Sequence, residues 1–421
     1  MVDINLIRKN PQKFKKASQA KGADVDINKL LEVDKKRRKL IQEKQKLKAK
    51  QNKLSEKIPN LSDQKKKKTI KKAKELSEKV DQRKDKLKKL NLEFEKLLKL
   101  VPNPALQDVK IGEDEKENEV IEKIGKISQF DFKPKSHLEL GEALDIIDTK
   151  RAAKVSGSRF GYLKNEAAIL EFALVRYGLE FLQKKGFIPV VPPTMVKKES
   201  MASMGYLERG ETEIYQTKRD NLYLVGTSEQ SVGPMHKDEV FQKKDLPLKY
   251  TSFSSCFRRE AGSYGKDVKG ILRVHQFDKM EMFVFCLPKD SKKEHQRLLN
   301  IEKELVKSLK IPFQVVKICT GDLGDSAASK YDIECFLPSQ NRYRETHSTS
   351  NCTDYQARRL NIKYKDASGD LKYIHTLNGT FFAVGRILIA ILENYQKKDG
   401  SIKVPDVLQK YVNFEKIKKK Q

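Results

Sequence analysis

The chain has 421 residues, of which 38% are hydrophobic and 34% are charged, and its formal net charge is +29. This length favours two domains, or one large domain with an appendage, over a single small core. No run approaches the ~18 apolar residues of a membrane-spanning helix, and the start of the chain lacks the apolar segment of a secretory signal, so we expect neither a membrane span nor a leader.

Positive charge is concentrated in the first hundred residues, which hold 33 lysines and arginines against 14 aspartates and glutamates. That segment carries +19 of the net charge, and the rest of the chain carries +10. A basic first quarter joined to a nearly ordinary remainder favours an appendage that binds a polyanion. The alternative is a lysine-rich helix surface that only keeps the protein in solution.

Two long helices are predicted in this basic quarter, over about 27–100. Apolar residues recur at steps of three and four over 30–58, after Asp26 as a helix cap, and again over 73–97. Pro59-Asn60 separates the two runs, so the loop between the helices is short and the helices must lie antiparallel. The pattern predicts a helical coiled-coil arm that is ~45–50 Å long at 1.5 Å per residue.

Each helix of this predicted arm has one narrow stripe of apolar residues, which packs against the other helix. The arm therefore has no further apolar surface to bury against the rest of the protein. The run Lys65–Lys68 lies near its tip and favours contact with phosphates. The alternative is a coiled coil that joins two copies of the chain.

The sequence changes character after a polar, charge-mixed connection at 105–135. Helices are predicted at 166–185 and 382–396. Strands are predicted at 187–191, 222–225, 250–257, 271–274, 280–287, 312–318 and 331–337. Because strands mostly follow strands, we expect an α+β domain with an antiparallel sheet over 136–421, after an N-terminal domain over 1–104.

The cysteines indicate a reducing compartment. Five of them lie far apart and form no CxxC pair: Cys256, Cys286, Cys319, Cys335 and Cys352. We therefore expect free thiols in a cytoplasmic protein, with neither a disulfide framework nor a zinc site.

The segment 256–281 concentrates residue types that a core would avoid. A strand, a glycine-rich loop and a returning strand would bring these side chains around one cleft: Arg258, Glu260, Arg273, Phe277 and Glu281. A guanidinium can grip a phosphate or carboxylate with two parallel hydrogen bonds, an aromatic face can stack on a base, and a carboxylate can accept from an ammonium. These types suit a nucleotide together with an amino acid. The alternative is a charged hairpin whose ion pairs only cover the surface.

The same segment resembles a known family. FRREAGSYGKDVKGILRVHQFDKMEM is similar to motif 2 of the seryl-tRNA synthetases, a class II aminoacyl-tRNA synthetase family. GFIPVVPP, which ends at Pro193, looks like the motif 1 of the dimer interface, and NGTFFAVGR looks like motif 3. The segments CTGDLGDSAASKYDIECFLP and YRETHSTSNCTDYQARR are also similar to that family, and the resemblance covers nearly the whole chain.

This resemblance implies a class II catalytic domain with an antiparallel sheet and an N-terminal tRNA-binding arm. It also implies a homodimer and a serine--tRNA ligase. Such an enzyme activates L-serine with ATP and Mg²⁺ to seryl-adenylate and pyrophosphate, and then transfers serine to the 3′ end of tRNA(Ser). A selenocysteine tRNA, tRNA(Sec), stays open as a second acceptor.

The resemblance also assigns site residues. The implied catalytic residues are Arg258, Glu281, Glu345 and Arg386. The implied ATP-binding residues are Arg258, Arg259, Glu260, Val274, Phe277, Glu345, Thr346, His347, Ser348 and Arg386. The implied serine-binding residues are Thr227, Ser228, Glu229, Arg258, Arg273, Glu281, Asn378 and Thr380. Glu345 and Ser348 would also hold Mg²⁺ with the ATP phosphates.

In these roles Arg258 would bind the α-phosphate and Arg386 the γ-phosphate. Glu260 would bind the adenine amino group, and Phe277 would stack on the ring.

On the serine side Arg273 would bind the carboxylate. Glu281 would receive the ammonium with help from Thr227 and Glu229, and Asn378 and Thr380 would contact the side chain.

Three features depart from the family pattern: Ser228, where alanine is usual, His347, where a small residue is common, and Phe381-Phe382, which replaces a smaller pair. Two alternatives remain, namely a relative that loads an amino acid onto a carrier protein and a non-catalytic RNA-binding scaffold. The first would be expected to lack the arm, and the second to have lost its charged site residues. No segment is left over for an editing domain, so none is predicted.

Overall fold

The computed structural model describes residues 1–261 and 269–419. It divides the chain into two compact units, one of residues 2–102 and one of residues 103–421 with Met1. Residues 262–268, which belong to the predicted glycine-rich loop, lie outside the described residues. No helix in the described part of the chain is long and apolar enough to cross a membrane.

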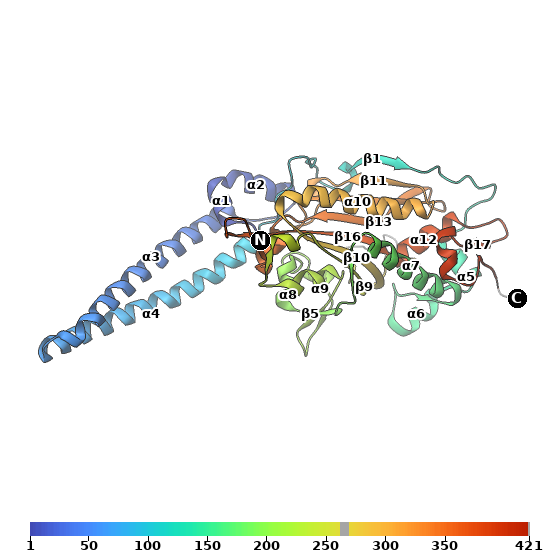
Figure 1. Ribbon diagram of the computed structural model, residues 1–421. Helices are drawn as coiled ribbons and strands as arrows, with labels where there is room; N and C mark the ends of the chain where they lie inside the picture. The colour runs from blue at the N-terminus through green and yellow to red at the C-terminus, as the bar shows by residue number, and fades with distance from the viewer. Residues whose placement is uncertain (262–268, 420–421) are drawn as a thin grey trace. The chain divides into compact units, whose positions relative to one another are not determined.

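The N-terminal unit consists of two short helices and two long ones. These are α1 (Ile4–Lys9), α2 (Pro11–Ala20), α3 (Ile27–Lys57) and α4 (Asp63–Leu100). Figure 1 shows α3 and α4 side by side, joined by the short 3₁₀ turn Ile58–Asn60. The side chain of Asp26 accepts a hydrogen bond from the Lys29 backbone N–H at 2.9 Å, so it caps α3 as the sequence predicts.

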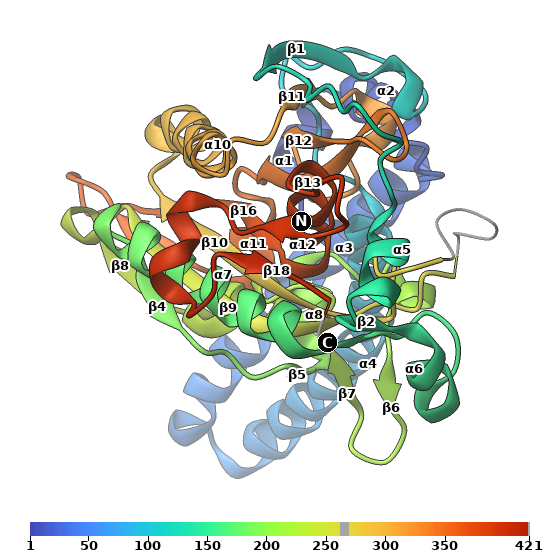
Figure 2. The same cartoon turned by 90° about the vertical axis from the view of Figure 1, so that its right-hand side faces the viewer.

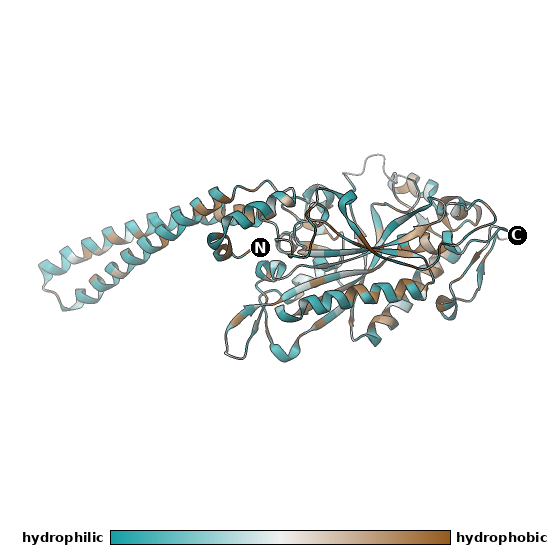
Figure 3. Cartoon of the chain, turned by 90° about the horizontal axis from the view of Figure 1, so that it is seen from above, coloured by the Kyte–Doolittle hydropathy of each residue, from teal (hydrophilic) through white to brown (hydrophobic). Residues whose placement is uncertain are grey.

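Burial in the hairpin formed by α3 and α4 is confined to the end near its termini. The buried residues are Ile27, Leu30, Val33, Asp34, Phe94 and Leu98. Figure 3 shows the rest of the hairpin as predominantly hydrophilic. Over most of their length, α3 and α4 are therefore held together only by a narrow stripe of partly buried residues.

An ion-pair cluster closes the buried end of the hairpin. Asp34 is fully buried, and its carboxylate lies 2.7 Å from the Arg8 guanidinium of α1 and 3.1 Å from Arg38 Nε. The Arg37 guanidinium lies 4.1 Å from the centre of the Phe94 ring. These contacts tie α1 and both long helices together where the seam is densest.

The second unit is built around an eight-stranded sheet within the described residues, in the order β1-β11-β12-β13-β16-β10-β9-β4. Its strands are β1 (Glu119–Ile124), β4 (Ile188–Val190), β9 (Leu248–Phe257), β10 (Gln276–Cys286), β11 (Phe313–Lys317), β12 (Ser329–Leu337), β13 (Arg342–Asn351) and β16 (His375–Ala383). Neighbours pair antiparallel except β4, which runs parallel to β9. The antiparallel α+β prediction is confirmed.

Helices cover both faces of this sheet (Figures 1 and 2). The large core lies against α7 (Asn165–Lys184), α10 (Ser291–Ser308) and α12 (Val384–Asn394). A smaller core lies against α8 (Lys198–Met204), α9 (Glu229–Val232) and α11 (Tyr355–Leu360). The side chains of a strand alternate between faces, so β10 sends Met280 and Met282 to the large core and Phe283 and Phe285 to the small one.

Three parts of the sheet differ from the predicted strands. Residues 271–274 form no strand, although Ile271, Leu272 and Val274 are buried, because a short apolar run does not distinguish a strand from a buried irregular segment. The strands β13 and β16 were not predicted, since their polar sequences lack apolar alternation. The segment expected to be a polar connection also contributes β1, which pairs with β11 at the sheet edge.

Candidate active site

Two β-bulges shape the polar face of the sheet. In β13, Thr346 is an extra residue, because His347 pairs with Ile333 and Glu345 pairs with Glu334. In β16, Phe381 is the extra residue between the partners of Met280 and Glu281. A bulge lets two side chains three positions apart share a face. Glu345 and Ser348 therefore both face the polar side.

The bulge in β16 also explains the unusual Phe381-Phe382 pair. Both rings are fully buried in the large core, and both lie close to Gly178 of α7. A Cβ at Gly178 would lie 2.6 Å from Met280 Sδ and 3.0 Å from a carbon of each ring, so glycine makes room for the two rings. This departure from the family pattern lies in the core on the far side of the sheet.

A cavity opens on the polar face. The predicted site residues among those that line it are Arg258, Glu260, Arg273, Val274, Phe277, Glu345, Thr346, Thr380 and Arg386. It combines an aromatic ring, three guanidinium groups and two carboxylates.

A larger cavity adjoins the first. The predicted site residues among those that line it are Thr227, Glu229, Arg258, Glu281, Glu345, Ser348, Asn378 and Thr380. Arg258, Lys279, Glu345 and Thr380 line both cavities, so the two form one continuous cleft. We call the first the small cavity and the second the large cavity.

Arg258 stands at the junction of the two cavities. Its Nε donates to the Gly226 carbonyl oxygen at 3.2 Å, and its guanidinium carbon lies 5.3 Å from the centre of the Phe277 ring. Its backbone exchanges hydrogen bonds with His275, whose Nδ1 lies 3.0 Å from the Arg258 carbonyl oxygen. The guanidinium is thus held on two sides and still lines both cavities.

Glu281 is almost fully buried at the floor of the large cavity. Its Oε2 lies 2.5 Å from Lys279 Nζ, 3.4 Å from Thr227 Oγ1 and 3.5 Å from Thr380 Oγ1. A cation and two hydroxyl groups therefore surround one carboxylate oxygen.

Glu229 lies beside Glu281 and is also buried. Burial raises the pKa of Glu229 to about 7, and the negative charge of Glu281 acts in the same direction. The Tyr206 hydroxyl donates a hydrogen bond to Glu229 Oε1, which favours the ionised form. The carboxyl group therefore titrates close to neutral pH.

Positive and negative side chains alternate where β12, β13 and α12 border the cleft. Arg386 lies 3.1 Å from Glu345 Oε2, and Lys330 lies 3.2 Å from Asp332. Desolvation alone would raise the pKa of Glu345, but the charges of Arg386, Lys330 and Arg258 hold it at about 2. Burial raises the pKa of Asp332 to about 7, against the effect of Lys330. Glu345 is therefore a permanent anion beside the cations.

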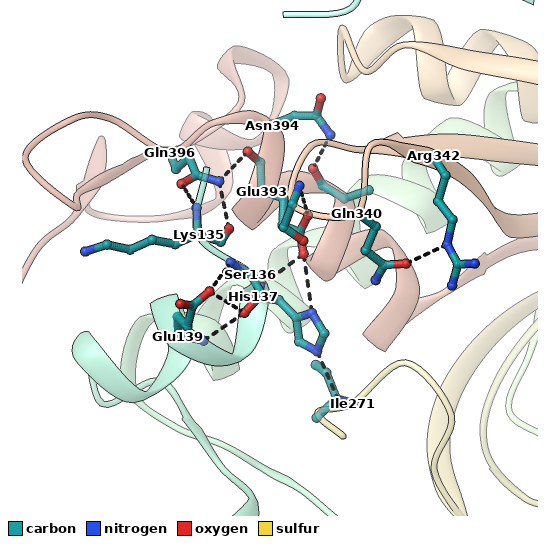
Figure 4. Close-up of polar contacts among 12 residues, drawn as sticks. Lys135, Ser136, His137, Glu139, Ile271, Gln340, Arg342, Glu393, Asn394 and Gln396 are labelled. Carbon is teal, nitrogen blue, oxygen red and sulfur yellow. Dashed lines mark hydrogen bonds and ion pairs between the residues drawn. The ribbon is translucent and has the colours of Figure 1, made fainter. Parts of the chain in front are cut away.

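A buried network supports the irregular wall of the small cavity (Figure 4). Glu393 of α12 accepts from the His137 backbone N–H at 3.1 Å, and His137 Nε2 accepts from the Ile271 backbone N–H at 3.4 Å. A Cβ at Gly270 would lie 2.0 Å from His137 Nε2, so only glycine fits there. Residues 271–274 are thus fixed by side chains, although they pair with no strand.

The structure does not bring every predicted site residue to the cleft. Ser228, Arg259 and His347 line neither cavity. The Ser228 hydroxyl contacts Ser252 Oγ at 2.7 Å, and His347 Nδ1 contacts Thr346 Oγ1 at 2.7 Å behind the bulge. Arg273 lines only the small cavity, where its Nη1 lies 3.3 Å from Glu260 Oε2. It therefore lies with the predicted ATP-binding residues.

Among the residues of the cleft that sequence reasoning missed are Lys279, Lys330 and Tyr206. Lys279 could have been found, because it lies between Phe277 and Glu281 at the two-residue spacing that puts strand side chains on one face. Lys330 and Tyr206 carry no such signal, since they come from segments that only the fold brings together.

Two family models match the chain. A model described as "Seryl-tRNA synthetase N-terminal domain" matches residues 1–105. A model described as "tRNA synthetase class II core domain (G, H, P, S and T)" matches residues 211–395.

Whole-length relatives are also similar to the chain. A serine--tRNA ligase of Dictyoglomus thermophilum is 44% identical over 100% of both chains. The crystal structure of seryl-tRNA synthetase from Pyrococcus horikoshii complexed with ATP has a TM-score of 0.93, 39% identity and full coverage of both chains. The cytoplasmic serine-tRNA ligase of Naegleria fowleri in complex with AMP has a TM-score of 0.89 and 32% identity, and the match covers 100% of this chain and 99% of that one.

Proposed function

The chain belongs to the seryl-tRNA synthetase family, and from that premise we propose that it activates L-serine with ATP and transfers it to tRNA(Ser). It is an aminoacyl-tRNA synthetase and therefore a ligase. The observation that carries the proposal is the continuous cleft, which joins three arginines and an aromatic ring at one end to a buried carboxylate at the other.

ATP would occupy the small cavity. The Phe277 ring offers a face for the adenine base, and Glu260, oriented by Arg273, offers a carboxylate for its amino group. Arg258 and Arg386 supply the charge for the phosphates, because a guanidinium matches phosphate geometry through two parallel hydrogen bonds. The complexes of the two relatives with ATP and AMP support a nucleotide in this fold.

Glu345, at the junction of the cavities, and Ser348, in the large cavity, also fit Mg²⁺. Glu345 stays ionised because its pKa is held at about 2, and Ser348 adds a hydroxyl oxygen on the same face. Magnesium prefers oxygen ligands and is commonly held by one or two carboxylates together with substrate phosphates. When bound, the ion would neutralise the developing charge on the leaving pyrophosphate.

Serine would occupy the large cavity, with its ammonium at Glu281 and its hydroxyl near Asn378 and Thr380. A site built to hydrogen-bond a hydroxyl rejects an analogue without one by ~10⁴–10⁵-fold in favourable cases, because its own polar groups would be left unpaired. Alanine should therefore be a poor substrate.

The activation step needs no nucleophilic side chain. One oxygen of the serine carboxylate forms a bond to the α-phosphorus, and the bond from that phosphorus to the bridging oxygen of pyrophosphate breaks. The protein holds the two reactants in line and stabilises charge on the phosphates, effects that are together worth several kcal/mol or more.

The hairpin would bind the backbone and the long variable stem of tRNA(Ser). Its exposed lysines, including Lys65–Lys68, suit recognition by charge and shape. We place the protein in the cytoplasm, where its five buried free thiols would stay reduced.

A second copy of the chain would cover an apolar surface near Pro193. Phe172 of α7 is 71% exposed and Val191 after β4 is 88% exposed, and Ile169 and Ile188 are also exposed. Large exposed apolar side chains gathered in one region favour a protein interface. We expect a homodimer, and Phe172→Glu should shift the sedimentation of the protein towards the monomer.

Two assays with the purified protein test the proposal. Serine-dependent exchange between ATP and pyrophosphate, with magnesium present, measures activation. Aminoacylation of transcribed tRNA(Ser) measures transfer, and tRNA(Sec) can be tested as an acceptor in the same assay. Absence of serine-dependent exchange would rule out the proposed activity.

A further inference from the structure

Lys279 occupies the centre of the cleft without a role in the proposed function. It lies on β10 between Phe277 and Glu281, and alternate residues of a strand are ~6.6 Å apart on the same face. Its side chain is almost fully buried and lines both cavities. Lys279 therefore stands between the aromatic ring at one end and the carboxylate at the other.

Its ammonium group lies where a substrate ammonium would have to bind. Lys279 Nζ lies 2.5 Å from Glu281 Oε2, the oxygen that also faces the hydroxyls of Thr227 and Thr380. The ammonium of an amino acid carries the same charge and the same three donors. The side chain and the substrate therefore compete for one carboxylate.

We propose that Lys279 is a catalytic cation that serine releases from Glu281, and that then binds where the serine carboxylate meets the α-phosphate. This inference rests on the proposed function. In the empty cleft Lys279 keeps the buried carboxylate paired, which avoids the penalty of an isolated buried charge. When the serine ammonium takes its place, the lysine swings into the junction of the cavities.

The two arginines proposed to bind the phosphates are less free to make this exchange. Arg258 is anchored to the Gly226 carbonyl oxygen, and Arg386 is paired with Glu345. Lys279 instead has a flexible stem and a partner that the substrate replaces. Its charge also acts on Glu229 of the same cleft and, through the sheet, on the buried Glu302 of α10.

The exchange changes no bond of the lysine. The serine carboxylate displaces pyrophosphate from the α-phosphorus, pyrophosphate leaves with the electron pair, and Lys279 keeps its proton throughout. The positive charge stabilises the negative oxygens that crowd together as attack proceeds. Before the reaction, Lys279 competes with the serine ammonium for Glu281, and this lowers the affinity for serine. In the transition state, Lys279 interacts with the negative oxygens at the α-phosphate, and this raises the rate of adenylate formation.

The test separates binding from chemistry in the full-length enzyme. In Lys279→Met, serine should bind as tightly as in the wild type or more tightly, measured by calorimetry with serine alone. The single-turnover rate of seryl-adenylate formation should fall by about 10²–10³-fold. Lys279→Arg keeps the positive charge, and its single-turnover rate should be at least about tenfold higher than that of Lys279→Met. Lys249→Met is the control, since Lys249 lies on β9 outside both cavities.

The outcomes are distinct. A single-turnover rate near that of the wild type in Lys279→Met overturns the inference. So does parallel loss of serine binding and rate with a normal melting temperature, because it would assign Lys279 a structural role. Should Lys279→Met fail to fold, Lys279→Gln is measured by the same two criteria. If the wild-type enzyme itself activates no serine, the proposed function is wrong, and the inference about Lys279 is overturned with it.

Discussion

The hairpin and the cleft both use basic residues, but they place them in opposite environments. In the hairpin, basic side chains are exposed and only a few residues near the termini of the two helices are buried. In the cleft, basic side chains are buried or held by carboxylates, carbonyl oxygens and an aromatic ring. A nucleic acid is attracted through water by many loosely placed charges, whereas chemistry on a phosphate requires a few fixed ones. Charge alone therefore does not define a site.

The strongest test of this contrast removes most of the hairpin. Glu43 and Arg83 face each other, with 4.0 Å between Oε2 and Nε, so residues 44–82 can be replaced by a Gly-Ser turn. We expect aminoacylation of tRNA(Ser) to be lost, because the cations that we propose to contact the tRNA phosphates are removed, while serine-dependent pyrophosphate exchange stays near the wild-type rate. Equal loss of both reactions would make the hairpin a structural element of the catalytic unit.

The converse test removes one fixed charge from the cleft. Arg258→Ala should lower pyrophosphate exchange by about 10²–10³-fold and should lower aminoacylation with it, because a preorganised cation at the reacting phosphate is lost. Binding of tRNA(Ser), measured by filter retention, should not change. Arg219→Ala, at an exposed position, is the matched control. A defect in tRNA binding would contradict the assignment of tRNA binding to the hairpin and of serine activation to the cleft.

The buried end of the hairpin should respond to an uncharged substitution. Asp34→Asn breaks the cluster with Arg8 and Arg38, and should lower the free energy of unfolding of the helical unit by about 1–3 kcal/mol, since the arginines are partly exposed. Urea unfolding followed by circular dichroism measures it.

The same cluster predicts a pH dependence. Desolvation opposes ionisation of Asp34, but Arg8 and the neighbouring arginines hold its pKa below the ordinary value. The stabilisation is therefore complete above about pH 4, the usual aspartate range, and is lost as the pH falls further. An Asp34→Asn variant should lose stability less steeply in acid. An identical acid profile would show that the cluster does not contribute.

In the cleft, Glu229 predicts a dependence near neutral pH. Its pKa is about 7 in the empty site, and a bound ammonium favours the ionised form. The KM for serine should therefore fall as the pH rises from 6 to 8, by up to about tenfold per pH unit below the pKa. Glu229→Gln should flatten this dependence. A wild-type KM that is constant across this range would show that Glu229 does not titrate on binding.

The smallest effect is expected at the tip of the hairpin. Replacing Lys65–Lys68 by alanine should reduce the slope of log affinity for tRNA(Ser) against log salt by roughly 0.7–0.9 for each phosphate that is no longer neutralised. Lys243→Ala with Lys244→Ala, at exposed positions of the second unit, should leave the slope unchanged. A slope that is equal in both variants would show that Lys65–Lys68 do not neutralise tRNA phosphates.

The hairpin was predictable almost residue by residue. Its cap at Asp26, its break at Pro59 and its end near residue 100 follow from local backbone chemistry. The strand β10 was also predictable, because Met280, Met282 and Val284 form a run of apolar residues that any core would bury.

The cleft was predictable only in part. The resemblance located Arg258, Glu281 and Arg386, and the structure brings all three to one cavity system. It did not separate His347, which turns away from the cleft, from Ser348, which lines it, because that difference depends on the bulge at Thr346. A bulge depends on how two strands pair, and pairing partners are distant in sequence.

The sequence by itself determined the elements and the charges: two basic helices with a thin seam, apolar strands, and the arginines and carboxylates of the three motif segments. Only the tertiary structure decided which of these charges meet. Lys279 is paired with Glu281, Glu345 is held ionised by Arg386 and Lys330, and Arg273 lies with Glu260. Helices and strands follow from interactions between residues close in the chain, whereas the pKa of a buried group and the fit of a cleft depend on neighbours that the fold brings from far away.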